Sequence, residues 1–263
     1  MKTSVRVVLF YLLAFVLMAI FGGVQMKILK IDFGEISLPQ FAPGLAALVM
    51  LGIFRKDKVR LTISVTRAQT LKYIEAVGIP LLVSGALFLI YNQFIGPLHI
   101  QPISAFPLLI FLGGTLLGAF GEELGWRGYL QRILEGKLNV FVASLLVGLL
   151  WGLWHVLNYQ KGPIYLSFFM LSTLGYSVLM AWLLRGTDYN VVIAMSFHFA
   201  VNTGAYILMD AINLPRFMML NGLVWAVVAA VIVVLNRKYF LSPVKKNVDG
   251  LVNNSKFTTA EQR

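Results

Sequence analysis

Residues 107–127 read PLLIFLGGTLLGAFGEELGWR, an apolar run that ends in two glutamates and an arginine. A helix rises about 1.5 Å per residue, so a run of this length can cross most of about 30 Å of hydrocarbon. Charged groups within a membrane span are costly, and by default they mark a functional site. The stretch therefore predicts a membrane-spanning helix that carries chemistry near one end.

The composition of the whole chain agrees with a lipid environment. Of 263 residues, 59% are hydrophobic and 13% are charged. Soluble domains average about 45–50% apolar and about 25% charged residues. So little charge cannot cover a water-facing surface, which excludes a soluble enzyme, a disordered chain and a coiled coil. The absence of cysteine excludes a disulfide scaffold, a thiolate metal site and a cysteine nucleophile.

Apolar runs recur along the chain at lengths typical of membrane helices. They predict an all-α polytopic membrane protein with about eight transmembrane helices. The second run is the shortest and has Pro43 and Gly44 near its start. The eight runs are Val7–Met26, Phe41–Phe54, Tyr73–Ile95, Ile103–Phe120, Val140–Tyr159, Pro163–Leu184, Val191–Met209 and Phe217–Leu235.

The basic residues favour one orientation. The formal net charge is +11, and the bases gather before the first run, in every second loop and after the eighth run. The alternate loops hold only Lys27, Lys30, Lys161 and Arg216. Lysines and arginines concentrate on the cytoplasmic side of membrane proteins, so we expect both termini in the cytoplasm. This distribution in short clusters between apolar runs also argues against a nucleic-acid partner.

Three polar clusters interrupt the apolar runs. The first is Glu122-Glu123 with Arg127, the second is Trp151 with His155, and the third is His198 with Asn202. Residues four apart share one face of a helix, so Glu123 can pair with Arg127, while Glu122 lies about 100° around the helix. Two adjacent acids with one base leave an excess negative charge that needs a proton, a cation or water.

The predicted topology places the three clusters at similar depth. From the assumed helix ends, Glu122 lies about 18 Å, His155 about 22 Å and His198 about 12–15 Å from the cytoplasmic side. One shared site is therefore possible. Within it, Glu122 could act as general base toward water, and His155 could orient that water. His198 and Asn202 could donate hydrogen bonds to a developing oxyanion.

A zinc site is the alternative chemistry for the same residues. Glu122, His155 and His198 are ligand types that zinc accepts, with a fourth position open for water. Their spacing is not diagnostic because they come from three helices, and the HExxH zinc motif is absent. The residues alone leave zinc or no cofactor as open alternatives.

The order of these motifs resembles the CPBP family of intramembrane proteases, which includes the type II CAAX prenyl endopeptidases. The resemblance rests on Glu122-Glu123-x-x-x-Arg127, an aromatic residue before His155, and His198-x-x-x-Asn202, and it covers roughly Leu108–Tyr206. The family's second motif usually opens with phenylalanine, and Trp151 stands there in this chain.

The resemblance implies an eight-helix fold with an intramembrane cavity open to the cytoplasm and peptide-bond hydrolysis near the membrane surface. It implies that Glu122 activates water, His155 holds it, His198 and Asn202 stabilise the oxyanion, and Glu123 and Arg127 support the site. Trp126 and Trp151 are candidates to line the substrate cavity. Both glutamate-type and metalloprotease mechanisms have been described for the family, so zinc stays open.

The chain then divides into N-terminal transmembrane helices over 1–100, catalytic helices over 101–240 and a polar cytoplasmic tail over 241–263 of one membrane domain. The expected partners are membrane lipid and a hydrophobic or lipidated peptide substrate, in a bacterial cell membrane. Two other functions remain open. One is a non-catalytic binding, scaffold or immunity protein that holds a hydrophobic peptide or lipid. The other is a transporter with a proton relay, against which the lack of internal repeats counts.

Overall fold

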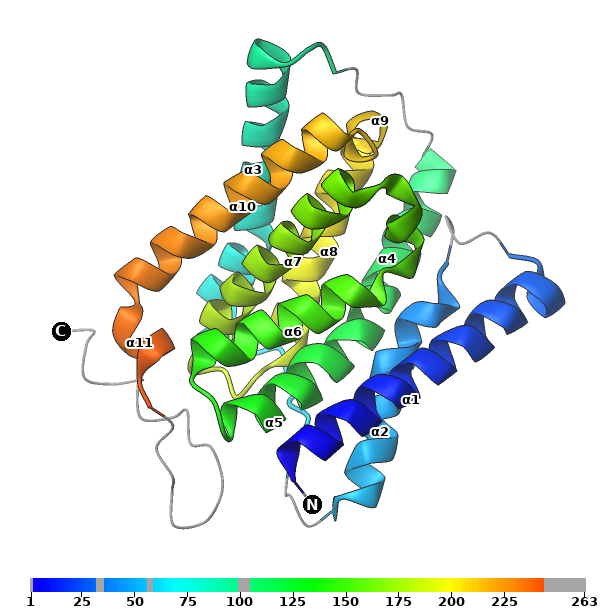
Figure 1. Ribbon diagram of the computed structural model, residues 1–263, viewed down its shortest axis with the longest axis vertical. Helices are drawn as coiled ribbons and strands as arrows, with labels where there is room; N and C mark the ends of the chain where they lie inside the picture. Colours follow the sequence, from blue (N-terminus) through cyan, green and yellow to red (C-terminus); the bar gives the residue numbers. More distant parts are fainter. Residues whose placement is uncertain (1, 32–35, 56–58, 99–104, 244–263) are drawn as a thin grey trace.

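The computed structural model describes residues 2–31, 36–55, 59–98 and 105–243, and within these ranges the regular structure is entirely helical (Figure 1). The polar tail from residue 244 onward lies outside the described residues, as does the start of the fourth apolar run. The α-helices are α1 (Thr3–Val24), α2 (Ala42–Ile53), α3 (Thr70–Phe94), α4 (Ala105–Glu123), α5 (Arg132–Glu135), α6 (Val140–Trp154), α7 (Pro163–Leu183), α8 (Val191–Ile207), α9 (Met209–Ile212), α10 (Pro215–Leu235) and α11 (Arg237–Leu241).

Each of the eight apolar runs forms a helix, which confirms an all-α polytopic membrane protein. Five helical segments are long and apolar enough to cross a membrane, namely Thr3–Leu29, Arg67–Phe94, Ala105–Glu135, Pro163–Leu183 and Pro215–Leu235. Three shorter apolar helices complete the set, namely Leu38–Ile53, Val140–Trp154 and Val191–Ile207. At about 1.5 Å per residue the shorter helices extend about 22–26 Å.

The helices pack into one bundle in which α7 is central. It packs against α6 on one side and α10 on the other, and α8 packs between α3 and α4. Helices α1 and α2 pair along one edge of the bundle, while α10 runs along the opposite edge (Figure 1). This arrangement brings α4, α6 and α8, which carry the three polar clusters, into the same bundle.

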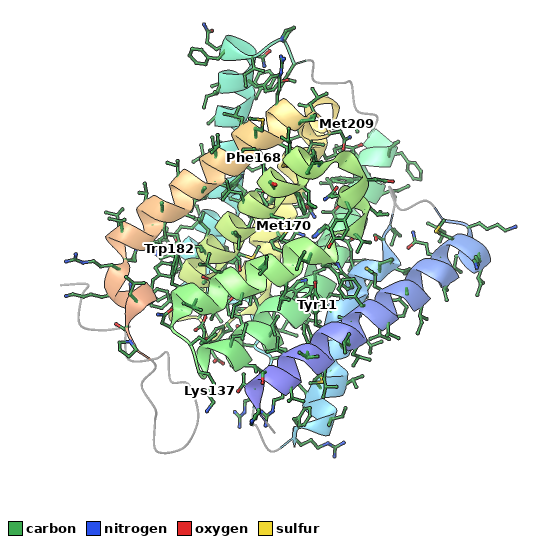
Figure 2. All side chains as sticks on the ribbon, viewed as in Figure 1. Tyr11, Lys137, Phe168, Met170, Trp182 and Met209 are labelled. Atoms are coloured by element: carbon green, nitrogen blue, oxygen red, sulfur yellow. The ribbon has the colours of Figure 1, made fainter. Side chains whose placement is uncertain are left out.

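The N-terminus, α5 and α11 lie at the same end of the bundle (Figure 1), as does Lys137 (Figure 2). This end is therefore the base-rich end predicted from the loops. Two helices begin here with asparagine caps. The side-chain oxygen of Asn139 accepts from the backbone N–H of Val142 at 2.9 Å, and that of Asn190 accepts from Val192 at 3.1 Å.

Helix α2 crosses the π-helical segment Leu124–Gln131, which continues α4, at very short range. A Cβ on Gly125 would lie 2.5 Å from the carbonyl carbon and oxygen of Pro43, so only glycine allows this approach. Small residues of this kind let membrane helices pack backbone against backbone. The short second apolar run is thereby held against the segment that carries the acidic cluster.

The fourth and fifth runs differ in detail from the predicted helices. Helix α4 continues as a π-helix over Leu124–Gln131 and then as α5, so the helical segment reaches Glu135. The fifth run was expected to be helical to Tyr159, but α6 ends at Trp154 and a 3-10 helix follows over Val156–Lys161. His155 therefore lies at the end of α6.

Candidate active site

Glu123 is the centre of a buried ion-pair cluster. The Arg127 Nη1 atom lies 3.1 Å from each Glu123 carboxylate oxygen, and both side chains are 0% exposed. On the facing helix α8, the Nδ1 atom of His198 lies 2.8 Å from Glu123 Oε1. The predicted pairing of Glu123 with Arg127 is therefore present despite the π-helical winding. The pairing of His198 with Glu123 was not predicted.

Glu122 has a different environment, although it is also buried. The indole N–H of Trp151 donates to Glu122 Oε2 at 2.7 Å, and the side-chain amide of Gln40 donates to Glu122 Oε1 at 3.1 Å. Both donors are neutral. The two adjacent acids therefore face different partners, as their positions about 100° apart on the helix lead us to expect. Glu123 receives the cationic partner, and Glu122 receives neutral hydrogen-bond donors.

His155 is fixed by the helix that it ends. Its Nδ1 atom lies 2.8 Å from the backbone carbonyl oxygen of Trp151, one turn earlier. A carbonyl can only accept, so Nδ1 carries the hydrogen of this bond. In the neutral ring the Nε2 atom then keeps a lone pair that can accept a hydrogen bond from water.

Trp151 joins these groups to one another. Its ring lies 4.5 Å from the Arg127 guanidinium carbon and 5.0 Å from the centroid of the His198 ring. The His155 ring is 5.9 Å away. The structure therefore brings Glu122, Glu123, Arg127, His155 and His198 together around one buried tryptophan.

Asn202 and Trp126 stand apart from this group. Asn202 lies one turn beyond His198 on α8 and is half-buried, and its side chain makes no hydrogen bond to any described residue. Trp126 is 0% exposed and packs against Phe10 and Trp154, at ring-centroid distances of 5.6 and 5.8 Å. It thus contributes to the core between α1 and α6.

A small cavity lies next to the site. Its volume is about 20 Å³, enough for one water molecule, and it is bounded by α3, α7, α8, α9 and α10. Tyr176 lines it and also contacts Trp151, with ring centroids 6.1 Å apart. The larger cavity open to the cytoplasm, implied by the resemblance, stays a prediction.

The arrangement does not fit a bound zinc ion. Within the described residues, no three histidine, cysteine, aspartate or glutamate side chains are grouped closely enough to hold a metal ion. Glu122, His155 and His198 share one neighbourhood, but His198 is paired with Glu123 and Glu122 with two neutral donors.

Comparison with known proteins identifies this segment. Residues 103–204 match the family described as Type II CAAX prenyl endopeptidase Rce1-like. The matched segment contains all three polar clusters. Over this segment the chain is similar to that family, and the match covers 102 of its 263 residues.

Several curated proteins are similar to the chain. The chain is 33% identical over 146 residues to CAAX prenyl protease 2 of Methanococcus maripaludis, covering 51% of this chain and 52% of that protein. It is 30% identical over 169 residues to Lysostaphin resistance protein A of Staphylococcus haemolyticus, covering 61% and 46%. The protein of the same name from Staphylococcus epidermidis is 32% identical over 169 residues, covering 62% and 44%. The chain thus spans about half the length of the curated relatives it matches.

Gln40 is the site residue that sequence reasoning missed. It lies in a 3-10 helix, Leu38–Phe41, just before the second apolar run and far outside the matched segment. Glutamine is uncharged and stands here in no recognisable motif. Its only signal in the sequence is its position beside the short run that contains Pro43.

Proposed function

We propose that the chain is an intramembrane endopeptidase in which Glu122 activates water for the hydrolysis of a peptide bond. The observation that carries this proposal is the division of roles between the two adjacent glutamates. Glu123 compensates the buried Arg127 and pairs with His198. Glu122 is equally buried but bonds to two neutral donors, and among the described residues no ion pair engages it.

In the proposed reaction, water bonds to Glu122 and to the Nε2 lone pair of His155. Glu122 takes a proton from the water as its oxygen attacks the carbonyl carbon of the peptide bond. Glu122 then transfers this proton to the leaving nitrogen as the C–N bond breaks. The second hydrogen of the water then passes from the new carboxyl group to the amine, so the products are a carboxylate and an ammonium group, and Glu122 returns to its ionised form.

His198 and Asn202 are the proposed oxyanion donors. Because His198 Nδ1 faces a carboxylate, its Nε2 atom carries a hydrogen only in the imidazolium form. The proposed donor role of His198 requires this form of the ring. Asn202 can turn its side-chain amide toward the same oxygen. Donors that are positioned before the reaction stabilise developing charge most effectively.

The proposed substrate is a hydrophobic or lipidated membrane peptide or protein. The buried position of Glu122 within a helical segment of membrane-spanning length requires that the scissile bond enter the membrane region. One relative is named for CAAX prenyl proteolysis, which supports a lipid-modified substrate as one form of this class. The base-rich end of the bundle is the proposed cytoplasmic side, with both termini there.

The test compares cells that express wild type, Glu122→Gln or Glu75→Gln at matched protein levels. Glu75 pairs with Lys72 at the surface of α3, so its glutamine variant is a matched control for loss of a carboxylate. Mass spectrometry of membrane and secreted fractions would map new peptide C-termini. We expect termini that depend on Glu122 and are kept in the Glu75 variant. Identical termini in wild type and in a folded Glu122→Gln protein would contradict the proposal and favour a binding or scaffold role.

A further inference from the structure

The side chain of Gln40 is held in one orientation by helix α4, against which it packs. A Cβ on Gly118 would lie 2.1 Å from Gln40 Oε1 and 2.6 Å from its Cδ atom, so the amide group occupies space that only glycine leaves open. The backbone of α4 therefore forms the surface beneath this amide. With its oxygen placed there, the Nε2 atom is presented to Glu122 Oε1 at 3.1 Å.

Trp151 is held just as firmly on the other side of Glu122. It is 3% exposed, and its ring is in contact with the Arg127 guanidinium and the His198 ring. A ring packed in this way cannot turn without displacing those groups. Its indole N–H is therefore fixed toward Glu122 Oε2, at 2.7 Å.

Two donors on different oxygens restrict the carboxylate in a way that one donor cannot. The terminal torsion of a glutamate side chain is broad and has no strong intrinsic preference. A hydrogen bond at each oxygen fixes the plane of the group. Each carboxylate oxygen can accept more than one hydrogen bond, so either one can still receive a proton from water.

We propose that Gln40 and Trp151 form a clamp that positions the Glu122 carboxylate for proton transfer. This inference rests on the proposed role of Glu122 as general base. Gln40 and Trp151 act through Glu122 and are positioning residues. The charged or titratable groups around Glu122 are Glu123 and Arg127 on its own helical segment, His155 after α6 and His198 on α8. None of them donates a hydrogen bond to Glu122 among the described residues, so the two neutral side chains have no substitute there.

The clamp predicts a loss of kcat without a matching change in KM. Trp151→Phe keeps an aromatic ring and removes the N–H, while Gln40→Leu keeps the size and removes the amide. Each substitution removes one hydrogen bond to a charged group, so we expect kcat to fall by about 10-fold. KM should change by less than about 2-fold, because the N–H of Trp151 and the amide of Gln40 are both engaged by Glu122, and Trp151→Phe keeps the aromatic ring that is a candidate to line the substrate cavity.

The experiment uses the reconstituted full chain with a quenched fluorescent peptide that carries a farnesylated CAAX C-terminus. Infrared difference spectra of isotope-labelled glutamate, with Glu122→Gln as the reference, report the carboxylate bands of Glu122 without any substrate. Trp154→Phe and Gln131→Leu are matched controls, because both residues are buried and bond or pack elsewhere.

Loss of kcat together with shifted Glu122 bands in Trp151→Phe and Gln40→Leu, and in neither control, would support the clamp. Wild-type kcat or unshifted bands in the folded variants would overturn it. Equal rates in wild type and Glu122→Gln would instead reject the proposed function, and the infrared bands would still test the clamp.

Discussion

Replacing Glu123 by glutamine removes the charge that compensates a fully buried guanidinium. Arg127 is 0% exposed, and its only hydrogen bond to a described residue goes to Glu123. Breaking a buried ion pair by removing one partner costs about 3–5 kcal/mol, because the remaining charge stays uncompensated. Neither side chain is exposed to water, so solvent screening does not reduce this cost. For a chain of this size such a loss lowers the melting temperature by about 10 °C.

The assay is the thermal unfolding of purified protein in detergent, followed by size-exclusion chromatography of the soluble fraction. Glu122→Gln is the matched control one residue away. Its amide oxygen can still accept from Trp151, and no cation is left without a partner, so a shift of only about 2–3 °C is expected. Equal melting temperatures for wild type and Glu123→Gln would refute the assignment of Glu123 as the counter-charge of Arg127.

Two further predictions concern the fold. Gly125→Ala places a methyl group 2.5 Å from the backbone of Pro43 and should destabilise the protein by about 1–3 kcal/mol. Gly78→Ala is the control, because open space surrounds Gly78, and it should leave the stability unchanged. Equal melting temperatures for the two variants would argue against the close crossing of α2. Single cysteines at the exposed Lys137 and Gln160 should react with an impermeant thiol reagent from opposite sides of the membrane, with Lys137→Cys labelled only after the cells are opened. Labelling of both from the same side would contradict the topology.

Much of the fold could be predicted because lipid imposes simple rules on a sequence. Each apolar run had to form a helix, since a backbone in hydrocarbon must satisfy its own hydrogen bonds. Helix ends were less predictable. The run through Tyr159 stays apolar past His155, and nothing in its composition shows that α6 ends at Trp154.

The candidate site was predictable to the extent that it depends on helical spacing. Glu123 and Arg127 are four apart, and their pair follows from the periodicity of the helix. The partner of His198 depends on how α8 is rotated against α4, which sequence spacing does not determine. The contact of Gln40 with Glu122 depends on the crossing of α2 over α4, between residues 82 positions apart.

We propose above that Glu122 directs water onto a peptide bond. The most direct measurement incubates the reconstituted protein and a cleavable membrane peptide in water enriched in heavy oxygen, and then analyses the new C-terminus by mass spectrometry. The account predicts one heavy oxygen in the new carboxylate with wild type and no new C-terminus with Glu122→Gln. A new C-terminus formed at the wild-type rate by the Glu122→Gln protein would contradict it.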